Sequence, residues 1–194
     1  MGFIEDFTKA IEGITDFQPH MFGGASKEEL FRLEKELGFV LPDDFKEFYQ
    51  RYNGQDEYAD ALFDIFYLCT IEQITSYWDA LKSNENEFMM IRAESDIGIR
   101  EIWGCSKWVP FASTADGHCL CMDLAPTEAG KAGQVITFWY NSPERELIAP
   151  SFKDFIMDYV KNIQEGVYIY EREDDGEISM GMIVRKDGEP MFGA

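Results

Sequence analysis

The segment from Ser26 to Gly54 constrains the fold more than any other part of the sequence, because it carries the signals of two successive helices. Ser26 and Glu29 have the S-x-x-E spacing of a capping box, in which each side chain satisfies a free backbone N–H of the first helical turn. Apolar residues then recur at helical spacing, and a glycine suited to end the helix follows at position 38. The sequence therefore predicts a helix over 27–37 with a core face of Leu30, Leu33 and Leu37.

A second helix follows almost at once and is predicted over 42–53. Proline is favoured at the first helical position, and the two aspartates after Pro42 suit the positive end of the helix dipole. The Asn53-Gly54 pair is a turn signal that ends the helix. Its core face is aromatic and consists of Phe45, Phe48, Tyr49 and Tyr52. We expect the two helices to pack their apolar faces against one sheet.

The remaining helices and strands form separate blocks. Periodicity and capping signals predict further helices at 3–14, 70–81 and 152–163. Apolar runs bounded by turn residues predict strands at 61–69, 107–112, 119–124 and 134–140. Residues 17–24 are rich in breakers and read as a linker, and 83–87 read as a polar loop. Because strands and helices are segregated, we predict an α+β fold with a mostly antiparallel sheet packed against the helix pair and the late helix.

The end of the chain has the pattern of a hairpin. Two strand-like runs, 167–172 and 177–185, flank the turn signal Glu173-Asp174-Asp175-Gly176. We therefore expect a single α+β domain over residues 1–166 and an acidic β-hairpin extension over 167–194.

The charge balance restricts the partners. Among 194 residues there are 17 Lys and Arg against 37 Asp and Glu, a formal net charge of −20. Such a surface repels nucleic-acid and membrane phosphates and attracts basic proteins, so we expect a protein partner, no direct nucleic-acid binding and no membrane binding. Two acidic clusters are predicted to bind it: Asp56, Glu57, Asp60, Asp64, Glu173, Asp174 and Asp175. The alternative is a solvated surface without a partner.

The sequence indicates a cytoplasmic protein. No apolar run approaches the roughly 20 residues of a transmembrane helix, and the acidic amino terminus lacks the pattern of a signal peptide. In a reducing compartment the four cysteines are expected to be buried free thiols rather than disulfides or zinc ligands: Cys69, Cys105, Cys119 and Cys121. We predict no metal and no cofactor, and the oligomeric state is left open.

A search for catalytic motifs finds no nucleophile elbow, phosphate-binding loop or zinc-binding helix signature. With two histidines in the chain, a three-histidine metal site is impossible. Asp116, His118 and Asp123 flank or adjoin an apolar strand and are the candidate ligand-binding residues. Turn formation at Asp116-Gly117 competes with that interpretation. We expect a protein that is not an enzyme.

Several of these segments, in order, resemble the SUKH superfamily. The first residues that match the family pattern lie in the predicted helix pair: Gly38, Leu41, Pro42, Asp43, Phe45, Phe48, Tyr52, Asn53 and Gly54. The next are Val109-Pro110-Phe111-Ala112, Asp116-Gly117, Cys121, Asp123-Leu124 and Gly133-Gln134-Val135. Pro150-Ser151-Phe152 with Phe155 matches the closing helix. The resemblance is strongest over 26–163. It departs at His118, where the family often has an acidic or polar residue, and the tail after Gly166 is not covered.

This superfamily includes yeast Smi and Knr cell-wall regulators and many bacterial immunity proteins. The resemblance implies a non-catalytic immunity or antitoxin-type protein that binds and neutralises a cognate toxin, such as a nuclease or deaminase. A basic toxin would suit the negative charge of this chain. The alternatives are a Smi/Knr-like regulatory scaffold in the control of cell-wall or glucan synthesis, and a small-ligand binder near Asp116 and Asp123.

Overall fold

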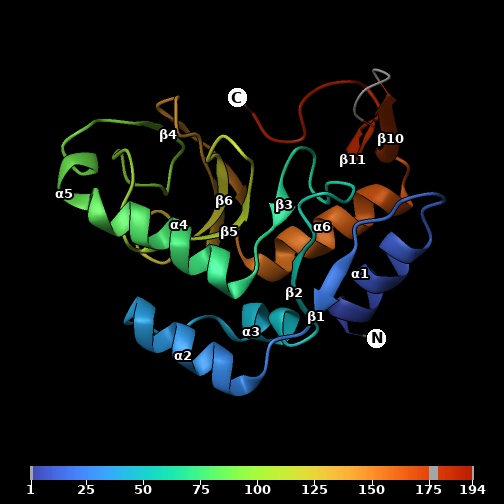
Figure 1. Ribbon diagram of the computed structural model, residues 1–194. Coiled ribbons are helices and arrows are strands. Elements are labelled where there is room, and N and C mark those ends of the chain that lie inside the picture. Colours follow the sequence, from blue (N-terminus) through green and yellow to red (C-terminus); the bar gives the residue numbers. More distant parts are fainter. Residues whose placement is uncertain (1, 175–178, 194) are drawn as a thin grey trace.

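A five-stranded antiparallel sheet in the order β3-β5-β6-β7-β9 forms the centre of the protein (Figure 1). The computed structural model describes residues 2–174 and 179–193. For residues 173, 174, 179 and 180 it describes the backbone only. The strands are β3 (Tyr67–Leu68), β5 (Trp108–Ser113), β6 (Cys119–Asp123), β7 (Gln134–Phe138) and β9 (Leu147–Ala149). Strands β5, β6, β7 and β9 follow one another with no helix between them, and the strands of this sheet pair antiparallel, so the α+β prediction is confirmed.

Both faces of this sheet are covered, and every residue of β5, β6 and β7 is buried. Neighbouring side chains on a strand point to opposite faces. Leu120 and Met122 therefore belong to the large core, whereas Cys119 and Cys121 belong to a second, smaller one. This explains why the strands read as continuous apolar runs rather than as alternating patterns.

The described residues form six helices, which pack on the sheet or on one another: α1 (Phe3–Glu12), α2 (Lys27–Leu37), α3 (Asp43–Tyr49), α4 (Ile71–Ser83), α5 (Glu85–Phe88) and α6 (Phe152–Gln164). Helix α6 packs on the large-core face, where the ring of Phe152 lies 5.1 Å from that of Phe111 in β5. Helix α4 runs along β5 and gives Leu81 to the smaller core. The two capping boxes predicted for α2 and α4 are both present.

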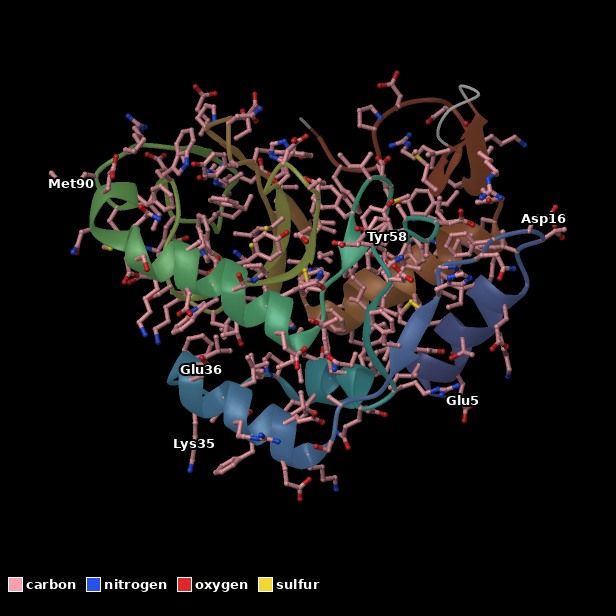
Figure 2. All side chains as sticks on the ribbon, in the orientation of Figure 1. Glu5, Asp16, Lys35, Glu36, Tyr58 and Met90 are labelled. Atoms are coloured by element: carbon pink, nitrogen blue, oxygen red, sulfur yellow. The ribbon has the colours of Figure 1, made fainter. Side chains whose placement is uncertain are left out.

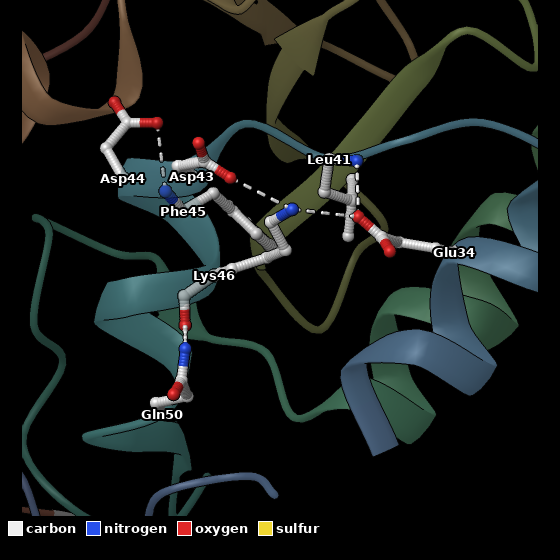
Figure 3. A network of polar contacts seen from close by, with 7 residues as sticks. All are labelled: Glu34, Leu41, Asp43, Asp44, Phe45, Lys46 and Gln50. Atoms are coloured by element: carbon white, nitrogen blue, oxygen red, sulfur yellow. Dashed lines mark hydrogen bonds and ion pairs between the residues drawn. The ribbon is translucent and has the colours of Figure 1, made fainter. Parts of the chain in front are cut away.

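The predicted helix pair is confirmed as a buried unit. Leu33 and Phe48 are 1% and 0% exposed. A polar network joins the two helices across the turn between them (Figure 3). Glu34 Oε1 accepts the backbone N–H of Leu41 (2.9 Å) and lies 3.2 Å from Lys46 Nζ. Since Lys46 also pairs with Asp43 at 3.1 Å, this lysine connects the end of α2 to the first turn of α3.

Four predicted segments differ in the structure: the helix 42–53, the linker 17–24, the strand 61–69 and the loop 83–87. Helix α3 ends at Tyr49 instead of continuing to residue 53, because residues 52–55 pair with the predicted linker as two short strands, β1 (Met21–Gly23) and β2 (Tyr52–Gln55). The predicted strand 61–69 is reduced to β3, because Phe63 and Phe66 bond to each other across a tight turn at Asp64. The predicted loop 83–87 contains α5, whose Glu85 accepts hydrogen bonds from Ser106.

The late hairpin is present and joins the large core. Strands β10 (Tyr168–Asp174) and β11 (Ser179–Arg185) pair antiparallel, as predicted. Ile183 is buried, and Met191 and Phe192 of the tail that follows also reach the core. A small parallel pair, β4 (Glu94–Ser95) with β8 (Glu144–Arg145), completes the strands of the described residues.

Candidate functional site

The acidic loop after β2 carries the first group of predicted partner-binding residues. Glu57 is exposed and Asp56 is half-buried, and the Asp56 carboxylate accepts the backbone N–H of Tyr58 (3.0 Å). Tyr58 itself is 91% exposed on the same loop (Figure 2). Tyrosine is enriched at protein interfaces, whereas aspartate and glutamate are depleted there, so Tyr58 is the residue of this loop that best suits a contact. The partner-binding role of Asp56 and Glu57 stays a prediction.

Asp60 lies inside the protein and is 4% exposed, so its side chain is not part of a surface that a partner can contact. Its Oδ2 accepts the backbone N–H of Gln18 (2.7 Å) and the hydroxyl of Tyr170 (3.0 Å). Its Oδ1 lies 3.6 Å from Arg172 Nη2. Because these contacts join three distant segments, Asp60 holds the β10–β11 hairpin to the rest of the fold.

The second acidic group is Glu173, Asp174 and Asp175, of which the first two end β10. Asp175 falls outside the described residues, and so do the side chains of Glu173 and Asp174. Their predicted role in partner binding stays a prediction.

A pocket of about 380 Å³ brings together residues that the sequence analysis assigned to different groups. We call it the His118 pocket, and its principal lining residues are Asp64, Asp116, His118, Phe66, Trp139 and Phe192. Asp64 was grouped with the loop acids, and Asp116 and His118 with the candidate ligand site. Among residues 2–174 and 179–193, no lysine or arginine lines this pocket.

Asp64 reaches the pocket from the tight turn before β3. Its backbone has φ 57°, in the left-handed region that aspartate tolerates better than most residues. The backbone N–H of Met191 donates to Asp64 Oδ2 at 3.1 Å. Burial raises the pKa of the Asp64 carboxyl, and the hydrogen bond from Met191 opposes that shift.

His118 reaches the pocket from the turn between β5 and β6. Its Nδ1 accepts the backbone N–H of Tyr140 (3.2 Å), which assigns the ring proton to Nε2 in the neutral imidazole. The ring packs edge-on against Trp139, with centroids 5.0 Å apart. Asp116 lies exposed on the same turn and has no ion pair among the described residues.

Asp123 does not join this pocket, which corrects the predicted grouping. It lies five residues beyond His118 on an extended strand, about 16 Å away. It is fully buried, accepts the backbone N–H of Ala125 (2.9 Å) and Nε2 of Gln134 (2.9 Å), and thereby closes the β6–β7 connection. Burial raises the pKa of its carboxyl, partly offset by these hydrogen bonds.

The four cysteines are free and buried, as predicted. Burial raises the pKa of the Cys69 and Cys105 thiols, which disfavours the reactive thiolate. Within residues 2–174 and 179–193, no three His, Cys, Asp or Glu side chains are grouped so as to hold a metal ion. The same part of the chain contains no helix with the length and apolar character needed to cross a membrane.

The sequence did not predict that aromatic residues line the His118 pocket. Trp139 was assigned to a strand, and Phe66 to a buried apolar run. Phe192 follows Pro190 and Met191 in a tail without periodicity, so its place in the pocket had no signal in the sequence. Alternation along the predicted strand 134–140 would place Trp139 and Tyr140 on opposite sides and is the one pattern that could have identified Trp139, although β7 itself ends at Phe138.

Comparison with known proteins places the fold in a family. The model of the SMI1 / KNR4 family (SUKH-1) matches residues 24–158. The cell wall biosynthesis/cell cycle regulator smi1 of Schizosaccharomyces pombe is 25% identical over 168 residues, which cover 78% of this chain and 33% of that protein. The cell wall assembly regulator SMI1 of Saccharomyces cerevisiae is 20% identical over 201 residues, covering 84% of this chain and 40% of that protein.

A bacterial relative matches over most of its own length. The SPbeta prophage-derived uncharacterized protein YokK of Bacillus subtilis is 28% identical over 172 residues, covering 78% of this chain and 81% of that protein. By contrast, this chain spans about a third to two fifths of these two fungal relatives. Since the family model matches well over half of the chain, the protein belongs to the SMI1/KNR4 (SUKH-1) family.

Proposed function

We propose that this protein is a non-catalytic, cytoplasmic immunity-type protein that binds and neutralises a basic protein toxin. The observation that carries the proposal is the net charge of −20 in a member of the SUKH-1 family. Opposite charges accelerate association, and a protein that must intercept a nucleic-acid-directed toxin gains from a fast encounter. The prophage relative, which this chain covers over 81% of its length, supports a domain that acts on its own.

The test uses the product of the neighbouring gene, which the proposal expects to be a basic protein toxin. We expect that its expression alone stops growth, that co-expression of this chain restores growth, and that the two purified proteins form a stable complex. The association rate should fall steeply as ionic strength rises. If the neighbouring protein is not toxic, or if the purified pair forms no complex at low salt, the proposal is wrong.

A second candidate function is a regulatory scaffold in cell-wall synthesis. It is favoured by the fungal relatives, which are named as cell-wall and glucan-synthesis regulators. Deletion of the gene distinguishes the two functions. A regulator predicts that the deletion strain is sensitive to cell-wall stress without any toxin, whereas an immunity protein predicts normal growth once the toxin gene is deleted as well.

A further inference from the structure

The His118 pocket has the chemistry of a cation site, since no lysine or arginine of the described residues lines it. Two carboxylates, Asp64 and Asp116, contribute to its wall together with the largely buried rings of Phe66, Trp139 and Phe192, of which Trp139 is 6% exposed. Aromatic faces attract cations through their quadrupole, and the carboxylates add direct charge. The apolar walls and the acidic groups therefore select the same kind of guest, a cation with an apolar or planar body.

The carboxylates have hydrogen-bonding capacity left for such a guest. Within the described residues, the Asp116 carboxylate accepts no hydrogen bond and forms no ion pair. Asp64 uses Oδ2 for the backbone of Met191, and its Oδ1 has no partner in the same part of the chain. A guest can therefore add bonds here without displacing any that hold the fold.

The surroundings favour a guest that belongs to a protein. Ile65 at the pocket is 43% exposed, and Tyr140, which lines a second cavity on the other side of Asp116, is 58% exposed. Exposed apolar groups around a charged pocket provide contact area for a macromolecular surface. The net charge of −20 favours a basic surface.

We propose that the His118 pocket receives the guanidinium of an arginine side chain presented by the partner protein. Arginine fits better than lysine because its planar, weakly hydrated group stacks on aromatic rings and binds carboxylates through two hydrogen bonds. This inference rests on the proposed function, since it names the contact by which the basic partner is recognised.

The first experiment is a titration with N-acetyl-L-arginine amide, followed by ¹H–¹⁵N NMR. We expect saturable shifts of the Asp116, His118 and Tyr140 amides and of the Trp139 indole N–H, with a dissociation constant in the millimolar range typical of one small contact, about 1–10 mM. N-acetyl-L-lysine amide should bind more weakly, and N-acetyl-L-glutamine amide should give no saturable shift. Absence of saturable shifts at these groups would overturn the inference.

Asp116→Asn tests the carboxylate, and Glu36→Gln in α2 is its matched control, because both remove one negative charge from an exposed side chain. Asp116→Asn should weaken arginine-amide binding by about fivefold, the upper range for a solvent-exposed ion pair. Glu36→Gln should leave it unchanged. Equal weakening by both variants would mean that the general charge of the protein attracts the probe, and the pocket would be excluded.

The second experiment measures dissociation from the neighbouring basic protein. Asp116→Asn combined with Asp64→Asn should raise the dissociation rate at least tenfold, whereas Glu36→Gln should change it less than twofold. If the wild-type complex forms but dissociates equally fast with all variants, the proposed function stands and the arginine contact is wrong. If the probe binds in that case, the pocket is a small-ligand site. If no wild-type complex forms, the proposed function is wrong, and so is the inference that an arginine of the partner binds in this pocket.

Discussion

The contact between Asp60 and the late hairpin permits a quantitative test of how the end of the chain is held. This carboxylate joins its own loop to two other segments. It contacts the backbone of Gln18, and on β10 it contacts the hydroxyl of Tyr170 and the guanidinium of Arg172. Gly181 lies against it as well, because a Cβ added at Gly181 would come within 2.2 Å of Asp60 Oδ1. The carboxylate is therefore enclosed between the hairpin and the loop after β2.

The perturbation is Asp60→Asn, alone and combined with Tyr170→Phe. An asparagine oxygen placed at Oδ2 can still accept from Gln18 and Tyr170, but both hydrogen bonds lose their ionic character. Hydrogen bonds to charged groups contribute about 1.5–3 kcal/mol and neutral ones about 0.5–1.5, so two weakened bonds cost about 2 kcal/mol. The Arg172 pair adds less than about 1 kcal/mol, because the arginine side chain is 49% exposed.

Tyr170→Phe removes one of the two hydrogen bonds and is expected to cost about 1.5–3 kcal/mol. Because the two residues share that bond, the double variant should lose about 1 kcal/mol less than the sum of the single losses. The free energies of unfolding come from urea titrations, with Glu57→Gln as the control that removes one exposed charge. The control should change stability by less than about 0.5 kcal/mol.

Two results would refute this reasoning. The first is a loss below about 0.5 kcal/mol for Asp60→Asn, which is the range of an unremarkable surface substitution. The second is additivity within about 0.3 kcal/mol, the behaviour of residues that do not interact. Either outcome would mean that Asp60 does not hold the hairpin.

Three further predictions concern the core at Phe48, the turn at Gly54 and the half-buried carboxyl of Asp64. Phe48→Ala should cost about 3–5 kcal/mol in a urea titration, because its ring contacts those of Phe7, Tyr52 and Phe152. Gly54→Ala should lower the melting temperature, since φ is 86° and its Cβ would lie 2.6 Å from the backbone of Thr70. The pKa of Asp64 is raised in the fold, so its neutral form contributes stability below the ordinary value of about 3.9. That stability is lost as pH rises through the higher folded-state pKa, and Asp64→Asn should flatten the pH dependence of unfolding in this interval.

The parts of the fold that were predicted correctly depend on local signals. The boundaries of α2 follow from the bonds between Ser26 and Glu29 and from Gly38, whose φ of 79° no other residue type adopts so readily. Tyr52 is a residue whose structure local sequence signals predict wrongly. Its spacing continues the aromatic face of α3, but it pairs in β2 with a strand thirty residues earlier, and no helical pattern reveals that pairing.

The candidate site was predicted in part for the same reason. Asp116 and His118 adjoin a recognisable turn, so their proximity could be inferred from the sequence. Asp64 was read as one acid in a charged run, because its left-handed backbone and its contact with Met191 depend on a tail more than a hundred residues away. Asp123 was grouped with the ligand residues because a carboxylate at a strand end looks the same whether it faces solvent or Gln134.

Several of the residues that carry the family resemblance hold the fold together, and Asp116 among them also lines the His118 pocket. Asp44, which follows the matched Asp43, accepts the backbone N–H of Lys153 (2.9 Å) and so caps α6 from the first turn of α3. Asn53 accepts the backbone N–H of Ile71 (3.0 Å) at the start of α4, and Asp123 is enclosed beside Gln134. By contrast, Asp64, Trp139 and Phe192 lie outside the matched motifs. Because function depends on a site rather than on a fold, family membership leaves the partner open. Specificity is therefore expected to depend on the side chains around the His118 pocket.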